Sequence, residues 1–568
     1  MGLPFNLSEY LITDDLTILL ALIAATVFLL NNLYKPQPLV HPILLGRQSD
    51  AGRARNPKES AVYRNYGTGL LGRFPIRPSK EVYILADLVK QESEAPRTLW
   101  STKITNTHLQ DRVASLGTGL LRLARLQPNE SNVLLLLNDS LEFIVADMAL
   151  ASHCIPSFTL ASSNLLSSVL ESHPPSAIIT HAFLLSQILE LIYDAGEKTG
   201  HHTIIVVGEP SSQAMASVAS NVKVLKFSEV EREGFKVEKV ISPLPKPSDI
   251  FTVSFFEGEG GQLQSAQLTH ENITAGVTAT RSLLPLSHTP SPLDTILSTH
   301  SLSTPYGRAI AYTAIYEGTS FATQRSSELY HIDDQQNPSD GSDIITGKRY
   351  PIPAPTILFI KPQHLNYLVS EILKQASKSW LLFPIAWRHK LAGIADGFLT
   401  KDSLWDRLVF DNARAKVMGD GAAALRAIIV SGGAIDAEKM TPSRIALSVP
   451  LVNTFIHPLV AGPVLASHAF DLQDFPAVTN DVLPSPAAHC GPPSVNVEAK
   501  LVGVDDELVE NGADPSGALL VRGPSVARLV SVEDYVDVQP EGDKDGWIIM
   551  GVRAKVQTNG SFQVLSQI

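Results

Sequence analysis

A glycine-rich segment with two acidic residues is the first place in this sequence where residue types suggest chemistry. It runs from Glu257 to Gln267, reads EGEGGQLQSAQ, and follows the apolar run 250–256. A glycine-rich loop between a strand and a helix can present backbone N–H groups to a phosphate. Acidic glycine turns are also common where no phosphate binds, so the loop alone is a weak signal. Its candidate phosphate contacts are Gly258 and Gly261.

Two other short segments contain residues suited either to a ligand or to a turn. Gly432, Gly433 and Ala434 follow Ser431 after an apolar run. Glycine there allows close approach to a ligand or a tight strand-to-helix turn. Thr269 precedes a helical pattern, so it is either part of a phosphate loop or the N-cap of that helix. The sequence favours the turn and the cap over a ligand.

Metal and hydrolase sites have little support. The pairs His153–Cys154 and His489–Cys490 contain four zinc-ligand types, but sequence neighbours rarely chelate one tetrahedral ion. No G-x-S-x-G or H-E-x-x-H motif is present. Two cysteines cannot form a disulfide framework, which points to a reducing compartment.

The surrounding elements alternate between buried strands and amphipathic helices. Helical patterns occur at Leu141–Ala151 and Phe183–Ala195, between apolar runs. This alternation predicts an α/β protein with largely parallel sheets. Glycine turns separate the last three runs, which predict a smaller β-rich subdomain. The predicted strands are 133–137, 177–179, 202–208, 222–227, 356–360, 427–431, 495–504, 518–522 and 547–549.

Several segments follow one another as the motifs of an enzyme superfamily do. In chain order they are the glycine-rich loop, Leu268-Thr-His-Glu-Asn-Ile273, Pro355-Thr-Ile-Leu-Phe359, Trp405-Asp-Arg-Leu-Val-Phe410, Ser431-Gly-Gly-Ala434, Gly517-Ala-Leu-Leu-Val-Arg-Gly-Pro524 and Asp545-Gly-Trp547. This order resembles that of the AMP-forming adenylate ligases. The Pro355 and Trp405 segments are most similar to the long-chain acyl-CoA synthetase branch. The resemblance covers roughly residues 36–568.

The resemblance implies an ATP site whose phosphate loop has been altered. Where the family has a serine, two threonines and a lysine, this sequence has Glu257, Glu259, Gly260 and Gln264. Two carboxylates would then face a triphosphate, and like charges about 4 Å apart repel by ~1 to 4 kcal/mol, depending on the dielectric. We therefore expect ATP binding to be disfavoured.

Other motifs that the resemblance assigns to the nucleotide have changed in the same direction. The threonine and glutamate of the family's Y-G-x-T-E segment align with Pro458 and Leu459. The aspartate that holds the ribose hydroxyls aligns with Val552, which cannot accept those hydrogen bonds. Of the L-P-L-x-H-x-x-E-R motif only Arg308 is kept. The family's mobile C-terminal domain, with its catalytic lysine, would follow Ile568 and is expected to be missing.

An apolar segment near the N-terminus predicts a membrane anchor. From Leu16 to Tyr34 there are 19 residues without a charge, about 28 Å as a helix. The acidic residues before it argue against a cleaved signal peptide. Because basic residues follow it, the positive-inside rule places the rest of the chain in the cytosol. A buried helix and an interfacial anchor remain as alternatives.

Composition limits the class of protein. Apolar residues are 44% of the chain and charged residues 18%, which excludes a disordered acidic chain. With 45 Lys+Arg against 57 Asp+Glu, the net charge of -12 argues against a nucleic-acid partner.

These observations together predict an α/β fold: an adenylation-type large domain with mostly parallel sheets and a smaller β-rich subdomain, preceded by one N-terminal membrane helix. The expected divisions are a membrane anchor at 1–35, a first α/β subdomain at 36–245, a second at 246–470 with the altered phosphate loop, and a β-rich subdomain at 471–568.

The predicted function is that of a membrane-anchored, long-chain acyl-CoA synthetase-like protein of lipid metabolism, without catalysis and with a binding or regulatory role. The alternative is an acyl-CoA synthetase or fatty-acid transport protein with weak or complemented activity. No cofactor is expected for a protein without catalysis. ATP with Mg²⁺ is expected only if the alternative, an active synthetase, holds. Expected partners are a membrane, a fatty acid or acyl-CoA, and another protein. The expected location is the endoplasmic reticulum or a lipid droplet, with the body facing the cytosol. No catalytic residue or metal ligand is assigned, and Gly258, Gly261, Thr269, Gly432, Gly433 and Ala434 are the vestigial nucleotide positions.

Overall fold

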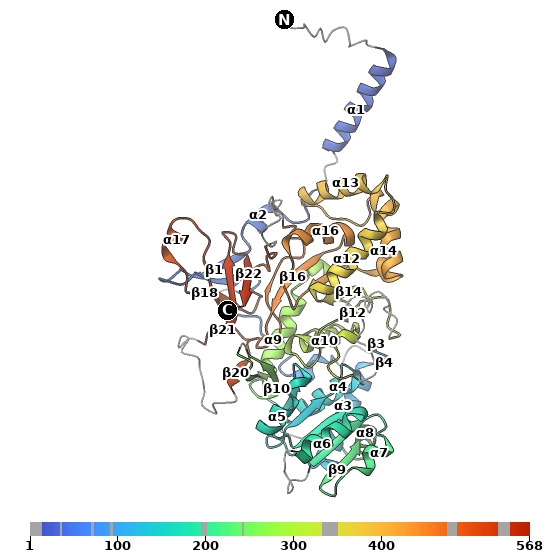
Figure 1. The fold of residues 1–568 in the computed structure, drawn as a ribbon, viewed down its shortest axis with the longest axis vertical. Coiled ribbons are helices and arrows are strands. Elements are labelled where there is room, and N and C mark those ends of the chain that lie inside the picture. Colours follow the sequence, from blue (N-terminus) through green and yellow to red (C-terminus); the bar gives the residue numbers. More distant parts are fainter. Residues whose placement is uncertain are drawn as a thin grey trace.

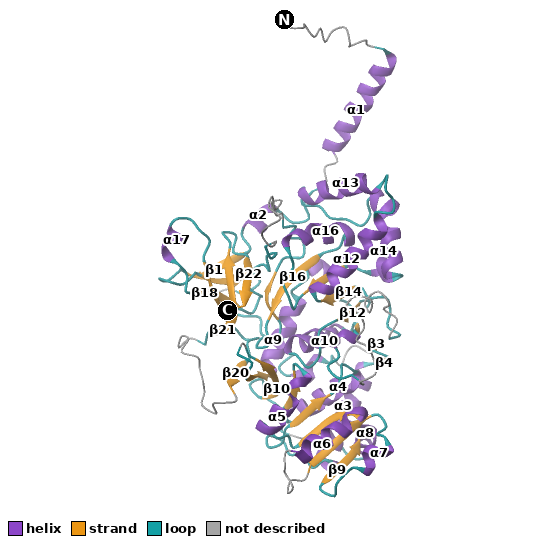
Figure 2. Ribbon diagram, in the orientation of Figure 1, coloured by secondary structure: helices purple, strands orange, loops and turns teal. Residues whose placement is uncertain are grey.

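Three β-sheets and the helices around them form the protein (Figures 1 and 2). The computed structural model describes residues 14–33, 37–69, 73–90, 95–194, 202–240, 243–258, 260–331, 350–473, 486–531 and 546–567. Two sheets have eight strands each and the third has six. The chain thus has the mixed α/β architecture that the alternating pattern predicts.

The first eight-stranded sheet is mainly parallel. Its order is β20-β11-β10-β6-β5-β7-β8-β9, with parallel pairing from β10 to β9. At the other edge β11 and β20 run antiparallel. The strands are β5 (Val133–Leu136), β6 (Ser157–Leu160), β7 (Ala177–His181), β8 (His202–Val207), β9 (Val222–Lys226), β10 (Ile250–Glu257), β11 (Leu263–Thr269) and β20 (Arg528–Ser531).

The second eight-stranded sheet is also parallel in its centre. Its order is β17-β16-β15-β14-β12-β13-β3-β4, and β16, β15, β14, β12 and β13 pair in parallel. Such strands are covered on both faces, which explains their uninterrupted apolar runs. They are β3 (Arg97–Leu99), β4 (Thr102–Ile104), β12 (Thr295–Ser298), β13 (Ser320–Thr323), β14 (Ile357–Ile360), β15 (Ala427–Val430), β16 (Leu451–Ile456) and β17 (Pro463–Ala466).

The third sheet is antiparallel, in the order β1-β2-β18-β19-β21-β22. Most of it comes from the segment predicted to be β-rich, but β1 and β2 come from near the N-terminus. The sheets therefore cross the predicted subdomain boundaries, because strands far apart in sequence pair through their backbones. The strands are β1 (Ser49–Arg53), β2 (Val62–Asn65), β18 (Glu498–Val502), β19 (Ser516–Arg522), β21 (Ile548–Val556) and β22 (Phe562–Gln567).

The helices begin at polar caps in several places. Thr105, Ser140, Ser211 and Thr304 each accept a hydrogen bond from a first-turn N–H. The α-helices are α1 (Asp15–Leu33), α2 (Pro42–Gly46), α3 (Asn106–Leu123), α4 (Leu141–Ser152), α5 (Leu166–Ser172), α6 (Leu185–Asp194), α7 (Ser212–Ala216), α8 (Phe227–Lys236), α9 (His270–Arg281), α10 (Pro305–Glu317), α12 (Pro362–Ala376), α13 (Phe383–Ala395), α14 (Asp411–Met418), α15 (Gly421–Ala424), α16 (Ala437–Leu447) and α17 (Asp506–Glu510). Short 3-10 turns lie at Leu85–Leu88, Ser163–Leu165, Ala182–Leu184, Leu286–His288 and Arg325–Ser327, and a π-helical turn, η8, spans Asp406–Phe410.

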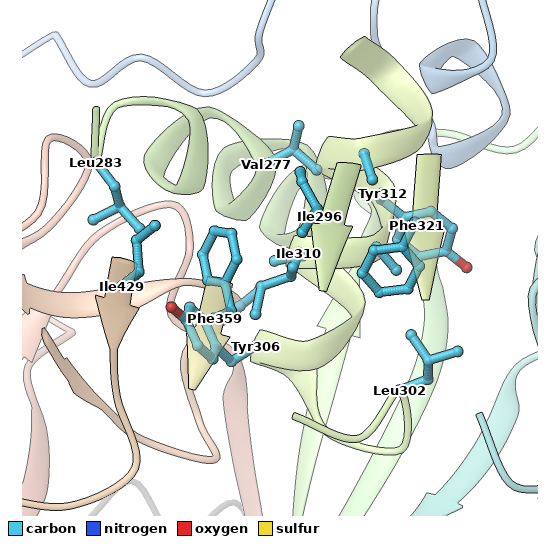
Figure 3. Packing of buried hydrophobic residues seen from close by; sticks show 14 of the residues in the cluster. Val277, Leu283, Ile296, Leu302, Tyr306, Ile310, Tyr312, Phe321, Phe359 and Ile429 are labelled. Atoms are coloured by element: carbon cyan, nitrogen blue, oxygen red, sulfur yellow. The ribbon is translucent and has the colours of Figure 1, made fainter. Parts of the chain in front are cut away.

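The core of the molecule lies around α9, α10 and the second sheet. Figure 3 shows Val277 and Ile310 from these helices beside Ile296, Phe321 and Phe359 from the strands. All five side chains are at most 4% exposed. This packing holds the turn between β12 and α10 in place.

Arg308, the charged residue retained from the L-P-L-x-H-x-x-E-R motif, is part of this core. Its Nη2 lies 3.5 Å from Asp147 Oδ1, and both side chains are fully buried. Tyr312 donates a hydrogen bond to the same carboxylate. Because these contacts join α10 to α4, Arg308 acts in the structure as a packing residue.

The predicted membrane-spanning helix is not supported. Its central part forms α1, whereas residues 1–13 and 34–36 lie outside the described residues. Within the described ranges, no helix combines the length and apolar character needed to cross a bilayer. Between Asp15 and Asn31 the apolar stretch 16–30 would extend only about 22 Å, against a hydrocarbon core of about 30 Å.

Candidate functional site

The glycine-rich segment forms the turn of a β-hairpin. We predicted strand, loop and helix, with the loop reaching Gln267, but residues 263–267 belong to β11. The prediction was wrong because β11 pairs with β10 on one side and β20 on the other, so its backbone groups are satisfied in a sheet. The loop is therefore confined to residues 258–262, of which Glu259 lies outside the described residues.

The turn uses backbone N–H groups that a phosphate would need. Gly258 N–H donates to Gln262 O at 2.8 Å, and Gly261 N–H donates to Gly258 O at 3.0 Å. Gly261 has φ +75°, a conformation that favours glycine. Its missing Cβ would lie 3.5 Å from Glu257 Oε1, so the acidic side chain lies beside the turn. In this conformation neither glycine offers its N–H to an anion.

Thr269 lies at the other end of the hairpin. It pairs with Ile250, whereas Leu263 pairs with Glu257 beside the turn. The six residue-to-residue steps from Leu263 to Thr269 separate the two ends by about 20 Å. The Thr269 hydroxyl accepts from Asn272 N–H at 3.2 Å, and Asn272 Oδ1 accepts from Thr269 N–H at 2.8 Å. The structure thus makes Thr269 a helix cap and separates it from the loop.

Three altered motif segments meet around one cavity of about 740 Å³. They are the hairpin turn, the start of the chain after β16, and the first half of β21. The lining residues are Phe256, Glu257, Gly258, Gln262, Gln264, Phe455, Ile456, His457, Pro458, Leu459, Leu529, Ile549, Met550, Gly551 and Val552. The alignment by resemblance predicted that the first two segments and β21 share a site, and their residues do line one cavity.

The electrostatics of this cavity do not suit a nucleotide with Mg²⁺. No lysine or arginine is among the described residues that line it, and Glu257 contributes a carboxylate. Burial lowers the pKa of His457 to about 4, so this ring is neutral near pH 7. Within the described ranges, no group of three His, Cys, Asp or Glu residues could hold a metal ion. A triphosphate would find a negative charge and apolar walls here, so the residues present do not fit ATP with Mg²⁺.

A second, smaller cavity of about 260 Å³ adjoins the first. The two share Phe256, Ile456, His457 and Pro458. The lining of the smaller cavity is mainly apolar, with polar side chains contributed by the turn after β12 and by residues 326–328. Within it the hydroxyl of Ser303, a residue 1% exposed, is buried without a hydrogen-bond partner. A polar atom of a ligand would satisfy that hydroxyl.

A buried histidine lines the smaller cavity, and a buried aspartate behind the lining holds the turn after β12. His300 Nε2 lies 2.7 Å from Ser431 Oγ, and burial, with Lys361 nearby, lowers the His300 pKa to about 3. Asp139 accepts hydrogen bonds from Leu302 N–H at 2.8 Å and from Ser327 Oγ at 2.6 Å. Burial outweighs these bonds and raises the Asp139 pKa to about 6. The turn therefore depends on a neutral ring and a carboxyl group in a dry environment.

The predicted glycine turn after β15 closes one side of the smaller cavity. Gly432 has φ +82°, and a Cβ there would lie 3.5 Å from His300 Cε1. Gly433 lies against Pro362, where a Cβ would come within 3.2 Å of its Cγ. Ala434 is exposed. The glycines are thus needed for the tight turn, and Gly432 also contributes to the cavity wall.

The family model described as "AMP-binding enzyme" matches residues 87–529. The chain belongs to the AMP-binding enzyme family.

Relatives of this chain include long-chain fatty-acid ligases. It is 24% identical over 326 residues to the human "Long-chain-fatty-acid--CoA ligase 1", covering 57% of this chain and 42% of that protein. It is 22% identical over 474 residues to the mouse "Long-chain-fatty-acid--CoA ligase 5", covering 82% of this chain and 64% of that protein. The chain therefore spans less than two thirds of these relatives' lengths. They support the long-chain acyl-CoA synthetase branch of the superfamily.

Solved structures of this family share the fold. An anthranilate CoA ligase in complex with anthranoyl-AMP matches with a TM-score of 0.58 and 17% identity, over 86% of this chain and 78% of that chain. A long-chain-fatty-acid-CoA ligase from Archaeoglobus fulgidus matches with a TM-score of 0.56 and 14% identity, over 87% of this chain and 85% of that chain.

Sequence reasoning did not single out the residues that shape the smaller cavity. His300 and Ser303 line it, and Asp139 holds the turn between them and α10. Ser303 lies in the segment aligned with the L-P-L-x-H-x-x-E-R motif, where only Arg308 was singled out. The buried acid after the strand 133–137 was the available signal, because carboxyl ends of parallel strands commonly face ligands. Nothing in the local sequence indicated that His300 would contact Ser431.

Proposed function

We propose that this protein is a long-chain acyl-CoA synthetase-like member of fatty-acid metabolism that binds an acyl ligand but does not form an acyl-adenylate. The observation that carries the proposal is the large cavity, where Glu257, Pro458, Leu459 and Val552 occupy positions that the family resemblance assigns to the nucleotide. Without cationic side chains on the described wall, the developing charge of phosphoryl chemistry would not be stabilised. A regulatory or binding role would then use the retained fold.

The proposed ligand site is the pair of adjoining cavities. The smaller one provides polar contacts for a carboxyl or thioester group, through Ser303 and the neighbouring turn. The larger one has the apolar side chains of Phe455, Leu529 and Ile549 on its wall. An apolar pocket with a few buried polar groups is the usual form of a small-molecule site. We therefore propose a fatty acid or an acyl-CoA as ligand.

We also propose that the protein works at a membrane of the endoplasmic reticulum or a lipid droplet, with its body in the cytosol. Helix α1 supports this proposal, because Leu16, Leu19, Leu22 and Phe28 are each more than half exposed. Apolar side chains on a solvent-exposed helix favour insertion into a lipid interface. Protease treatment of intact microsomes would digest the body if this topology is correct, and a protected body would contradict it.

Calorimetry with ATP and with a long-chain acyl-CoA tests the central proposal. We expect acyl-CoA or fatty-acid binding well below millimolar and no measurable ATP binding, since the described lining of the larger cavity, where the family resemblance places the nucleotide, lacks lysine and arginine. Pyrophosphate release with a long-chain fatty acid should be absent in the wild type. Robust release by the wild type would overturn the proposal.

A loop variant separates a single lost contact from loss of the whole site. Gln264→Lys should not restore pyrophosphate release, because Glu257 lies on the same wall and would pair with the new lysine. Adding Glu257→Ser removes that acid, but Val552 still leaves the ribose without an acceptor. Groups that act together in catalysis are not restored one at a time. Recovery by Gln264→Lys alone would show that only one part of the site had changed.

The second candidate function is an active fatty acid–CoA ligase. The observation that favours this function is that the relatives are named as long-chain-fatty-acid–CoA ligases. Thioester formation from fatty acid, CoA and ATP by the purified full chain would establish this alternative.

A further inference from the structure

We propose that the end of the molecule formed by α2, α13 and the turn before α13 is a second lipid-binding surface, which lies on the same bilayer as α1. We call it the apical face and define it by Ile43, Leu44, Trp380, Leu381, Ile385 and Leu391. This inference does not depend on whether the cavities bind ATP or an acyl ligand. Its occupant is the surface of a phospholipid bilayer.

The side chains of the apical face are unusually exposed for their size and polarity. Trp380 is 75% exposed, Leu381 63% and Ile385 52%, while Ile43 and Leu44 on α2 are 74% and 65% exposed. Single exposed leucines are ordinary on soluble proteins, but large apolar groups gathered at one end mark an interaction site.

Contacts between the chain after α1 and the residues just after α13 place α2 beside the C-terminal end of that helix, while Trp380, Leu381 and Ile385 lie at its N-terminal end. Leu39 N–H donates to Gly397 O at 3.0 Å, and a Cβ on Gly397 would lie 3.0 Å from Pro38 Cβ. Pro42 follows three residues after Leu39, at most about 11 Å of chain, so α2 begins near Gly397, just beyond the end of α13. Figure 1 shows α1 projecting from the same end of the molecule.

The body holds α13 so that its apolar residues point outward. On the inner side Ala386, Lys390 and Ile394 are buried, at the four-residue spacing of one helix face. Lys390 Nζ lies 2.6 Å from Asp406 Oδ2 and anchors that face to η8. Ile385 and Leu391 are left on the solvent side, where burial in lipid would remove their apolar surface from water.

A bilayer is a better occupant of the apical face than a folded-back helix α1 would be. Along the first turns of α1, Leu16, Ile18, Leu19, Leu20 and Leu22 are all at least half exposed. Because successive residues point about 100° apart, these side chains surround the helix. Packing against α13 would cover only one stripe of α1, whereas lipid covers all sides.

The composition of α13 also suits the water–lipid boundary. Arg388 and His389 are exposed between Ile385 and Leu391 on the outward side of the helix. Tryptophan with basic and branched apolar residues is typical of helices that lie in the interface. Since the chain carries a net charge of -12, apolar insertion and not overall charge attraction should dominate binding.

Vesicle flotation with the full chain tests this surface. The test variant is Trp380→Ser with Leu381→Ser and Ile385→Ser. The matched control is Leu244→Ser with Leu286→Ser and Leu293→Ser, whose native side chains are 85%, 96% and 93% exposed elsewhere. On phosphatidylcholine vesicles at limiting lipid, the test variant should partition about tenfold more weakly than wild type. The control should match wild type, and equal flotation of test and control variants would overturn the proposal.

A fluorescent label on the apical face tests directly whether this surface contacts lipid. Ile385→Cys can be labelled with an environment-sensitive dye because the native Cys154 and Cys490 are buried. Vesicles should shift its emission to the blue, whereas the same dye at Leu286→Cys should not respond. Blue emission at position 385 before vesicles are added would mean that α1 or a second copy covers the face, and this would overturn the proposal. So would the absence of any shift on adding vesicles.

Discussion

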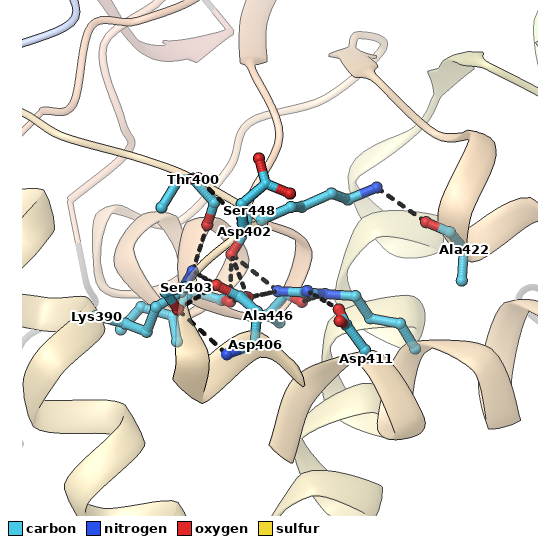
Figure 4. Close-up of polar contacts among 12 residues, drawn as sticks. Lys390, Thr400, Asp402, Ser403, Asp406, Asp411, Ala422, Ala446 and Ser448 are labelled. Atoms are coloured by element: carbon cyan, nitrogen blue, oxygen red, sulfur yellow. Dashed lines mark hydrogen bonds and ion pairs between the residues drawn. The ribbon is translucent and has the colours of Figure 1, made fainter. Parts of the chain in front are cut away.

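Two regions of the molecule contain segments that resemble the same family, and they differ in what holds their side chains. The Trp405–Phe410 segment forms η8, where Asp406 is fully buried among helices (Figure 4). Its carboxylate accepts from Lys390 Nζ at 2.6 Å, Arg414 Nη2 at 2.9 Å and Ser403 Oγ at 2.6 Å. The large cavity, in contrast, is lined at the hairpin turn by the exposed Glu257, and no lysine or arginine is among the described residues of that wall.

This difference separates residues needed by the fold from residues needed by a ligand. Arg414 also donates from Nε to Ala446 O at 2.6 Å and contacts Ser448, so the ionic cluster joins η8, α14 and the end of α16. Losing one member leaves buried charges without partners. At the cavity a change of side chain leaves only a different surface facing solvent. A sequence can therefore lose ligand chemistry there while the same fold persists.

The largest effect should follow from breaking the ionic cluster. Asp406→Ala leaves Lys390 and Arg414 buried without their shared carboxylate, and we expect the free energy of unfolding to fall by about 3 to 5 kcal/mol. Asp411→Ala is the matched control, because Asp411 also pairs with Arg414 but its side chain is 49% exposed. This control should lose less than about 1 kcal/mol. Urea unfolding followed by circular dichroism would measure both, and equal losses would contradict the comparison.

Acid should weaken the fold through two buried histidines. Burial lowers the pKa of His270 to about 4 and that of His300 to about 3, below the ordinary value of about 6.5. At pH values between about 6.5 and the folded-state pKa, each histidine binds a proton in the unfolded chain but not in the folded chain. The free energy of unfolding therefore falls as pH falls below about 6.5. At pH 5 each histidine should lower the free energy of unfolding by about 2 kcal/mol relative to neutral pH. His270→Asn should flatten the pH dependence of urea unfolding, and an unchanged slope would contradict this assignment.

Protonation of Asp139 should raise the free energy of unfolding in acid, by less than the two histidines lower it. Its pKa is raised to about 6, so protonation favours the folded state, and this contribution is lost as pH rises from about 4 through 6. Asp139→Asn keeps an acceptor for Leu302 N–H but removes the titration. Acid destabilisation should then become steeper, by about 1 kcal/mol between pH 7 and pH 5. A shallower slope would show that Asp139 is not the group that opposes the histidines.

The smallest effect should come from the cavity wall. Glu257→Gln changes an exposed side chain beside the turn, so the free energy of unfolding should change by less than about 0.5 kcal/mol. Thermal unfolding of this variant beside Asp406→Ala gives the comparison in one experiment. A loss of several kcal/mol at Glu257 would mean that the hairpin turn is structural, and the contrast between the two regions would disappear.

Several features of the fold could be predicted because they depend on short stretches of sequence. The apolar runs at 133–137 and 427–431 became the parallel strands β5 and β15. Thr269 is the helix cap that its position before a helical pattern predicted, and Asn272 completes the cap. Long-range pairing could not be predicted in the same way. None of the predicted strands lies within residues 49–65, yet these residues supply β1 and β2, because β2 pairs with β18, more than 400 positions later.

For the candidate site, too, the side-chain chemistry could be predicted from the sequence, whereas the contacts between distant segments could not. Sequence by itself determined that Glu257, Gln264, Pro458, Leu459 and Val552 lack the charges and hydroxyls of a nucleotide site, since residue type alone sets side-chain chemistry.

Only the tertiary structure decided where those residues lie and which neighbours they have. Pairing of β11 with β20 reduced the glycine-rich loop to a hairpin turn and placed Thr269 at its far end. Packing of α10 against the second sheet brought Asp139 and His300 into a dry environment, which shifts their pKa values. These outcomes depend on burial and on contacts between distant segments, and neither is encoded in any local stretch of the chain.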